Sequence, residues 1–379
     1  MEQKMIVVES DYRKLDEWIN KKDVKRAMLV CGGSLKRMSF FTEHLDRINR
    51  DVEIIPFSDF CPNPQYESVM EGVKRFRTRS CDAIIAVGGG SAMDVAKCIK
   101  LYSNMNGDGE NGGYLRQEIV PNGIPFLAIP TTAGTGSEAT RFAVVYYEGV
   151  KQSVMSESLI PDTVLMDGRF LNYLPMYQKK VTMMDGFCHA LESFWSVNST
   201  KESKGYSRKA IEMVLKNMEG YLANTEDGNW NMLAASHLAG RAINITQTTA
   251  GHAMCYKITS LFGLAHGHAA ILCNRILFPW MIENTDKCVD LRGEEYVKSV
   301  FGEIARAMGC EAEPEAARKV KEVFERLKLP VPVATAAQFE ELKMSVNPVR
   351  LKNHPIQLSG DTIDMLYHKI LREQRISRI

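Results

Sequence analysis

Long apolar runs and an excess of charge of one sign are both missing from this sequence. No stretch approaches the roughly 18 consecutive apolar residues that a membrane-spanning helix needs. The N-terminal segment MEQKMIVVESDYRKLDEW carries acidic residues inside its apolar part, so it lacks the core of a secretory signal peptide. The formal net charge is +1 without a long block of like charge, which gives no support for a nucleic-acid-binding protein.

Paired cysteines are missing as well. The nine cysteines are scattered along the chain, and no two of them form a CxxC pair. An odd number without such spacing argues against a disulfide framework or a zinc knuckle. Together with the missing membrane and signal segments, this predicts a cytoplasmic protein with reduced thiols.

Short apolar runs alternate with amphipathic segments in the first part of the chain. The runs lie at 4–10, 26–33, 52–58 and 81–89, and the segments 35–49 and 66–80 have helical spacing. Because the runs are continuously apolar rather than alternating, they suit strands that are buried on both faces of a parallel sheet. The pattern predicts a doubly wound α/β domain over residues 1–162.

The character of the sequence changes after about residue 162. Strand signals become rare, and long helical patterns cover 177–197, 203–222 and 229–246. The remainder, residues 163–379, is therefore predicted to be an all-helical domain. With 379 residues, of which 45% are hydrophobic and 25% charged, the chain is long enough for two such cores.

Two glycine-rich or threonine-rich turns follow predicted strands of the first domain. The stretch AIIAVGGGSAMDVAKCIKLY gives a strand, a turn of Gly88, Gly89, Gly90 and Ser91, and a helix. Exposed backbone N–H groups at a helix start favour a phosphate, although the turn does not match GxGxxG and is alone more often a tight connection. A second strand runs into PTTAGTGSE, which offers the small donors Thr131, Thr132 and Thr135. Two such loops at strand ends predict a nucleotide site at this edge of the sheet.

The strand at 26–31 bears on the choice of nucleotide. It ends in LVCGGSLKR, where an NAD-selective site commonly places an acidic residue for the ribose hydroxyls. Gly32 is neutral there, and Ser34, Lys36 and Arg37 could hold a 2′-phosphate or could simply begin a solvated helix. We therefore favour NADPH slightly over NADH.

Four residues of metal-ligand type stand out in the second half. Asp185 and His189 are four residues apart in a helical pattern, so they share one helix face. His252 and His266 follow in the stretch GHAMCYKITSLFGLAHGH. One such pair is more often a coincidence, but four candidates in a chain with eight histidines are better support. A carboxylate and three imidazoles suit Fe(II) or Zn(II), with positions left for a substrate oxygen.

These motifs occur in an order that resembles the iron-containing (group III) alcohol dehydrogenase family. The resemblance runs over nearly the whole length, through PNPQYESV, AVGGGSAMDVAK, IPTTAGTGSEAT, LIPDTVLMD, DGFCHALES and GHAM…HGHA. It implies a Rossmann-like nucleotide domain, a helical metal domain with the active site in the cleft, and a dimer or larger assembly. It places Asp185, His189, His252 and His266 on the metal ligands, and Gly88 to Ser91, Thr131, Thr132, Asn63 and Lys151 on nucleotide positions.

The sequence departs from the family at one position near the metal ligands. Many relatives have HAMAH where this chain has HAMCY, so Tyr256 replaces a histidine that is commonly assigned to proton handling. A phenol with an ordinary pKa of about 10 can still donate a proton to a developing alkoxide. Lys257 could lower the pKa of this tyrosine or point to solvent, and His268 is a second candidate for proton handling.

Two features resemble the phosphonoacetaldehyde reductase branch of the family. They are the segment HAMCYKITSLFGLAHGHA and the late loop NPVRLKN. Members of that branch reduce phosphonoacetaldehyde to 2-hydroxyethylphosphonate, which requires cations near the substrate. The candidates are Arg141, Lys257, Arg350 and Lys352, with the two arginines ranked first; a cation of this kind, taken alone, is more often an ordinary surface residue.

The resemblance predicts a metal-dependent NAD(P)H aldehyde reductase. A general short-chain alcohol dehydrogenase is the alternative within the same class. A lyase of the dehydroquinate synthase type shares the sheet-plus-helices fold, but the TTAGTGSE loop and the spacing of Asp185 and His189 favour a dehydrogenase. A nucleotide-binding protein without turnover would explain the missing histidine but not an intact set of four ligands.

Overall fold

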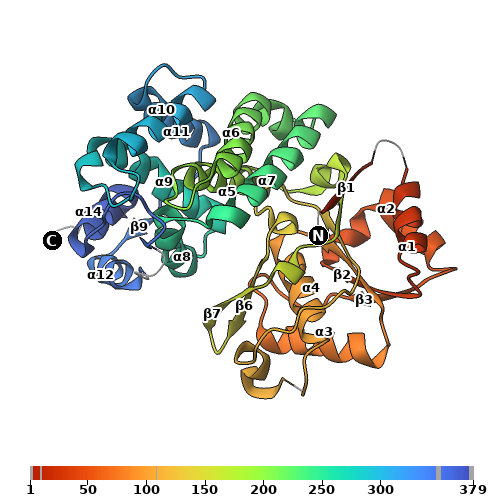
Figure 1. Ribbon diagram of the computed structural model, residues 1–379. Helices are drawn as coiled ribbons and strands as arrows, with labels where there is room; N and C mark the ends of the chain where they lie inside the picture. The colour runs from red at the N-terminus through yellow and green to blue at the C-terminus, as the bar shows by residue number, and fades with distance from the viewer. Residues whose placement is uncertain (1–2, 9–10, 108, 347–350, 375–379) are drawn as a thin grey trace. The chain divides into compact units, whose positions relative to one another are not determined.

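The computed structural model describes residues 3–8, 11–107, 109–346 and 351–374. The chain forms two compact units, Met1–Leu174 and Pro175–Ile379 (Figure 1). The sequence suggested a boundary at residue 162, but the strand that follows it, β8 (Thr163–Met166), belongs to the first unit. The reason is that β8 pairs with strands on both of its sides, β1 and β5.

The first unit contains a six-stranded sheet in the order β1-β8-β5-β4-β2-β3, and all its pairings are parallel. Parallel strands need long crossovers, and the helices of this unit supply most of them. The other strands are β1 (Lys4–Val7), β2 (Arg26–Cys31), β3 (Glu53–Phe57), β4 (Ala83–Gly88) and β5 (Phe126–Pro130). The helices are α1 (Arg13–Lys21), α2 (Ser39–Ile48), α3 (Tyr66–Thr78) and α4 (Gly90–Tyr102). This arrangement is the α/β fold that the apolar runs predict.

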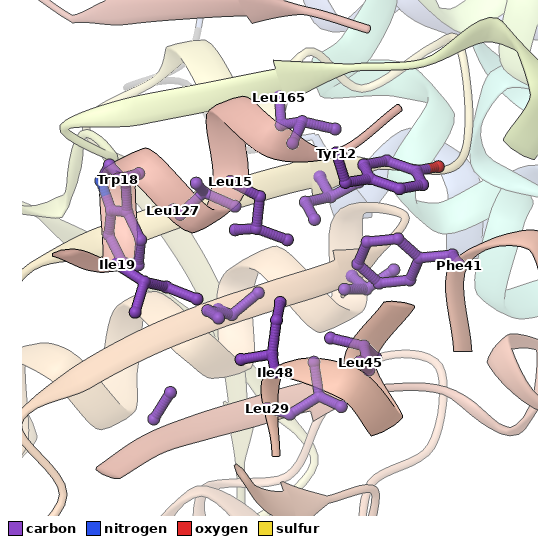
Figure 2. Close-up of a cluster of buried hydrophobic side chains, with 14 of the residues drawn as sticks. Tyr12, Leu15, Trp18, Ile19, Leu29, Phe41, Leu45, Ile48, Leu127 and Leu165 are labelled. Carbon is purple, nitrogen blue, oxygen red and sulfur yellow. The ribbon is translucent and has the colours of Figure 1, made fainter. Parts of the chain in front are cut away.

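The runs are continuous because the central strands have no solvent-facing side. Every residue of β4, β5 and β8 is buried. Alternate residues of the strands face α1 and α2, and Figure 2 shows this layer. Its labelled side chains are Tyr12, Leu15, Trp18, Ile19, Leu29, Phe41, Leu45, Ile48, Leu127 and Leu165.

A separate antiparallel hairpin extends the first unit. It consists of β6 (Phe142–Tyr147) and β7 (Val150–Met155). The backbone N–H of Tyr146 donates to the carbonyl of Pro64 over 2.8 Å, which attaches the hairpin to the segment before α3. The hairpin was not anticipated from the sequence.

The second unit is helical, as expected, apart from a short parallel pair of β9 (Val333–Ala334) and β10 (Arg372–Glu373). Its central helix, α5 (Met176–Trp195), is almost entirely buried from Met183 onward. Two neighbouring helices begin at the polar caps Thr200 and Thr225, each of which accepts a hydrogen bond from the first turn. The helices most extensively in contact with α5 are α6 (Lys201–Leu222), α7 (Glu226–Thr246), α9 (His266–Glu283) and α10 (Glu294–Ala307). The unit also contains α8 (Ala250–Phe262), α11 (Glu313–Leu327), α12 (Ala336–Ser345) and α14 (Gly360–Ile370).

The segment before α14 that contains Asn353 and His354 is attached through Asn353 to the chain just after α5. The carbonyl of Asn353 accepts from Val197 N over 3.0 Å, and its side-chain oxygen accepts from Asn198 over 2.9 Å. The next residue, His354, is buried, and neither of its ring nitrogens has a hydrogen-bond partner among the described residues. Burial lowers the pKa of His354 to about 4.

His354 should make the protein acid-sensitive. Its unfolded pKa is about 6.5, so the unfolded chain takes up the proton first as the pH falls. The free energy of unfolding should therefore decrease between pH 6.5 and pH 4, by roughly 3 kcal/mol from this residue. Urea denaturation of the metal-free wild type and of His354→Leu, each at pH 7 and pH 4.5, would measure the difference. An equal loss of stability in both proteins would contradict the expectation.

Candidate metal centre and nucleotide-binding loops

Three helices bring the four predicted metal ligands together. Asp185 and His189 project from successive turns of α5, His252 lies in the first turn of α8, and His266 begins α9. Ligand atoms of Asp185, His189 and His252 all lie within 4.8 Å of one another, and these three residues are buried. Asp185 Oδ1 is 3.6 Å from His252 Nε2 and 3.9 Å from His266 Nε2. The fourth residue thus belongs to the same cluster.

The chemistry of this cluster fits a divalent metal ion. Asp185 Oδ1 and His252 Nε2 are buried, and neither has a hydrogen-bond partner in the described part of the chain. Atoms that each lie about 2.0–2.2 Å from one ion are themselves separated by roughly 3–3.5 Å, which is close to the spacing seen here. Burial alone would raise the pKa of Asp185, but the surrounding histidines hold it well below its usual range, so the carboxylate is ionised. One anionic oxygen among imidazole nitrogens is a set that Fe(II) or Zn(II) accepts.

Two glycines next to histidine ligands allow the helices to approach this closely. A Cβ atom on Gly267 would lie 2.0 Å from the carbonyl oxygen of Val181 and 2.7 Å from Cβ of Asp185. A Cβ on Gly251 would lie 2.4–2.5 Å from side-chain atoms of Asn274 and Glu192. Both helix contacts therefore require glycine, and the ligand positions depend on them.

The two candidates for proton handling have different surroundings. The ring of Tyr256 stacks on that of His266, with centroids 5.3 Å apart and planes inclined by 22°. His268 is buried, its Nε2 lies 2.9 Å from the carbonyl oxygen of Pro330, and its Nδ1 lies 3.0 Å from the hydroxyl of Tyr177. The carbonyl oxygen of Pro330 can only accept, so Nε2 carries a proton, and burial lowers the pKa of His268, which favours the neutral ring. Among the described contacts of these two residues, only the ring stacking of Tyr256 on His266 reaches a metal-ligand candidate.

The two predicted nucleotide loops are packed against each other. Thr131 N donates to the carbonyl of Gly88 over 2.9 Å, where β4 and β5 end side by side. A Cβ on Gly89 would lie 3.0 Å from Thr132, and a Cβ on Gly90 would lie 3.0 Å from Thr135. Ser91 lies in the first turn of α4. This helix has 13 residues, and its N-terminus lies at the glycine turn. Free N–H groups and the helix dipole make this edge of the sheet suitable for a pyrophosphate.

A buried lysine holds the second loop in place and escaped the sequence-based analysis. Lys97 Nζ donates to the carbonyls of Ser137, Thr140 and Phe142 over 2.6–2.7 Å. Asp94, on the preceding turn of α4, accepts from the Ser137 hydroxyl over 3.1 Å. A lysine in a helix ordinarily indicates a solvated face, so no local signal marks this contact.

The remaining nucleotide candidates lie in the same unit. Gly32 follows β2, whose last residue is paired with Val87 of β4, and Ser34 is exposed in the short helix Gly33–Arg37. Asn63 is exposed and has a positive φ of 58° just before the segment bound to β6. Lys151 lies on β7, directly opposite Tyr146 of β6. Asn63 is therefore next to the residue that binds the hairpin, and Lys151 is part of the hairpin.

Two of the four proposed substrate cations form ion pairs with carboxylates of the protein. Arg141 forms an ion pair with Glu157 at 2.6 Å, and Lys257 forms one with Glu341 at 2.5 Å. Lys352 is exposed in the loop before α14. Arg350 lies outside the described residues. An anionic substrate would therefore have to compete with Glu157 for Arg141 and with Glu341 for Lys257.

Comparison with known proteins agrees with this architecture. The family model "Iron-containing alcohol dehydrogenase" matches residues 3–168, and the model "Fe-containing alcohol dehydrogenase family, C-terminal" matches residues 179–371. Alcohol dehydrogenase 4 of Saccharomyces cerevisiae is 27% identical over 317 residues, which is 82% of this chain and 80% of the yeast protein. An NAD-dependent methanol dehydrogenase from Bacillus methanolicus is 30% identical over 267 residues, which is 67% of each chain.

A solved structure shares the fold over almost the full length. Sulfoacetaldehyde reductase from Bifidobacterium kashiwanohense, determined in complex with NAD+, has a TM-score of 0.86 at 23% identity, covering 97% of this chain and 96% of that one. Among the described residues, no helix combines the length and apolar character required to cross a membrane. The two family models together account for nearly all of the sequence, and the chain therefore belongs to the iron-containing alcohol dehydrogenases, a family of oxidoreductases.

Proposed function

We propose that this enzyme uses NAD(P)H to reduce a small aldehyde to a primary alcohol, with phosphonoacetaldehyde as the favoured substrate. The observation that carries the proposal is the buried cluster of Asp185, His189 and His252, in which two ligand atoms lack hydrogen-bond partners within the described chain. The substrate is suggested by the HAMCY segment and the late loop, and by the sulfoacetaldehyde reductase of similar fold. Nine free cysteines support a cytoplasmic location.

Each part of the chain has a role in such a reaction. A divalent ion supplies a Lewis acid that polarises a carbonyl group and lowers the pKa of an alcohol. Asp185, His189, His252 and His266 would hold that ion. The loops at Gly88–Ser91 and Thr131–Thr135 would bind the nucleotide phosphates and orient the nicotinamide for hydride transfer. Tyr256 would supply the proton that the reduced oxygen needs.

Removal of the Tyr256 hydroxyl should slow turnover without loss of metal. Tyr256→Phe keeps the ring that stacks on His266, so metal content should stay at the wild-type level. The value of kcat should fall several-fold or more, because a positioned general acid contributes about 10²–10⁴-fold and water can replace it in part. Steady-state kinetics and elemental analysis of the purified protein would measure both quantities.

The matched control is Tyr177→Phe, which removes the hydroxyl next to His268. It should leave kcat unchanged if Tyr256 is the donor. The opposite result, a loss of activity in Tyr177→Phe alone, would assign proton transfer to His268 instead.

Substrate and cofactor selectivity test the finer part of the proposal. The value of kcat/KM for phosphonoacetaldehyde should exceed that for neutral aldehydes of similar length, and NADPH should be used at least as well as NADH. Arg141→Ala should raise KM for the phosphonate more than for a neutral aldehyde. Equal values for charged and neutral aldehydes would reject the phosphonate, and a clear preference for NADH would reject the NADPH prediction.

A general short-chain alcohol dehydrogenase is the second candidate. The ion pairs of Arg141 with Glu157 and of Lys257 with Glu341 favour it, because they leave less positive charge for an anionic substrate. The same substrate panel separates the two functions.

A further inference from the structure

Glu192 of α5 has the most extensively bonded carboxylate near the metal-ligand cluster. It lies two helical turns after Asp185 and is fully buried. Its Oε1 is 2.5 Å from His252 Nδ1 and accepts from Asn274 Nδ2 over 2.9 Å. Its Oε2 accepts from the backbone N–H of Thr249 over 2.6 Å and from the Thr249 hydroxyl over 2.9 Å. Donors thus surround both oxygens.

These contacts assign the protons of the network. The NH₂ group of Asn274 and the backbone N–H of Thr249 can only donate, one to each oxygen of Glu192, and this favours the ionised carboxylate. An ionised carboxylate accepts at Oε1, which requires the proton of His252 to lie on Nδ1. The other ring nitrogen, Nε2, faces Asp185 Oδ1, 3.6 Å away, and is the atom that a metal ion would bind.

We propose that Glu192 is a positioning residue for the metal centre, which fixes His252 as the Nδ1–H tautomer and keeps Nε2 available as a ligand. The inference rests on the proposed function, because it concerns the same site. A carboxylate behind a histidine ligand orients the ring and increases its basicity, so the bound ion is held more tightly.

The cost of burying Glu192 supports a role beyond packing. The described residues provide no lysine or arginine partner, and its ion-pair contact is with His252 alone. Removing an ion from water costs several kcal/mol unless charge and hydrogen bonds compensate for it. A neutral residue of the same shape would avoid this cost if only packing were needed.

The local backbone is also adapted to this contact. A Cβ on Gly251 would lie 2.5 Å from Glu192 Oε1 and 2.4 Å from Asn274 Oδ1. Only glycine at this position lets the start of α8 lie so close to the carboxylate. His252, the following residue, thereby reaches Glu192 from the same helical turn.

The decisive variant is Glu192→Gln. If the amide oxygen faces His252, the NH₂ group faces the N–H of Thr249, and two donors oppose each other. If the amide is turned round, NH₂ faces His252 Nδ1, which must then accept, and the proton moves to Nε2 and blocks the ligand position. The control is Ser193→Ala. Ser193 is the next residue of α5 and is as deeply buried as Glu192, but its hydroxyl accepts a hydrogen bond from Thr246 and does not contact His252 in any described interaction.

Affinity for Zn(II) would be measured by chelator competition on the full chain. Glu192→Gln should weaken binding by about 10- to 100-fold, while Ser193→Ala should stay within about twofold of wild type. Wild-type affinity in a folded Glu192→Gln protein would overturn the proposal. Equal weakening in both variants would also overturn it, since general destabilisation would then explain the loss.

A measurement on the wild type keeps the inference testable if Glu192→Gln does not fold. Histidine ¹⁵N spectra of the Zn(II)-loaded chain should show His252 protonated at Nδ1 and metal-bound through Nε2. The opposite assignment would refute the role of Glu192. Neither measurement depends on turnover, so failure to reduce any aldehyde would reject the proposed function and leave this inference intact.

Discussion

Asp185→Asn should give a folded protein that no longer retains a divalent metal ion and reduces aldehydes about 10²–10³-fold more slowly. Asp185 provides the one carboxylate among the four ligand candidates, and its Oδ1 faces Nε2 of both His252 and His266. Asparagine preserves the size of the side chain but removes the negative charge that offsets the charge of the ion. Elemental analysis and single-turnover oxidation of NADPH would measure the two losses.

The control for this experiment is Asp227→Asn, an exposed carboxylate in the first turn of α7. It should keep both metal and activity. Wild-type protein treated with a chelator should lose activity and regain it with Fe(II), whereas Asp185→Asn should not respond. Full metal content in Asp185→Asn would show that the cluster is not the metal site.

Gly267→Ala should disrupt the same centre without altering any ligand. The new methyl group would lie 2.0 Å from the carbonyl oxygen of Val181 and 2.7 Å from Cβ of Asp185, both on α5. Because these atoms belong to a helix, α9 must move away, and His266 moves with it. We expect a loss of stability of roughly 1–3 kcal/mol and a large loss of metal affinity. Urea denaturation and chelator competition would determine both.

Gly205→Ala is the matched control. Gly205 is an exposed glycine inside α6, and a Cβ there would have nothing within 4 Å. Alanine should stabilise this helix by roughly 0.5–1 kcal/mol, since glycine is the weaker helix former. Wild-type metal affinity in Gly267→Ala would show that α5 and α9 have more room than their contact indicates.

The sequence points to those parts of the candidate site that leave a local signature. Asp185 and His189 are spaced for one helix face, and the loops after β4 and β5 carry small residues at the ends of buried strands. These features are set by residues near one another in the chain, so spacing and residue type are enough to find them. The strand order and the inclusion of β8 in the first unit depend on pairings between distant segments.

The residues that hold the site in place left no such signature. Glu192 and Lys97 have the appearance of ordinary charged helix residues, and only tertiary contacts give them partners. Gly251 and Gly267 also look unremarkable until the neighbouring helices are known. The positive charges of Arg141 and Lys257 are visible in the sequence. Their ion pairs are not, because the partner carboxylates lie 16 and 84 positions away.

The contact between the two nucleotide loops has a consequence for recombining this enzyme with its relatives. Gly89 and Gly90 each lie against a threonine of the other loop, and a Cβ atom on either glycine would be 3.0 Å from that threonine, which would have to shift. A chimera with one of these loops from a relative and the other from this chain would bring together glycines and threonines that do not come from the same protein. The smallest exchangeable segment is therefore the pair of loops with the lysine at position 97, which binds the end of the second one. Grafts of residues 88–142 as one block should retain a working nucleotide site more often than grafts of either loop alone.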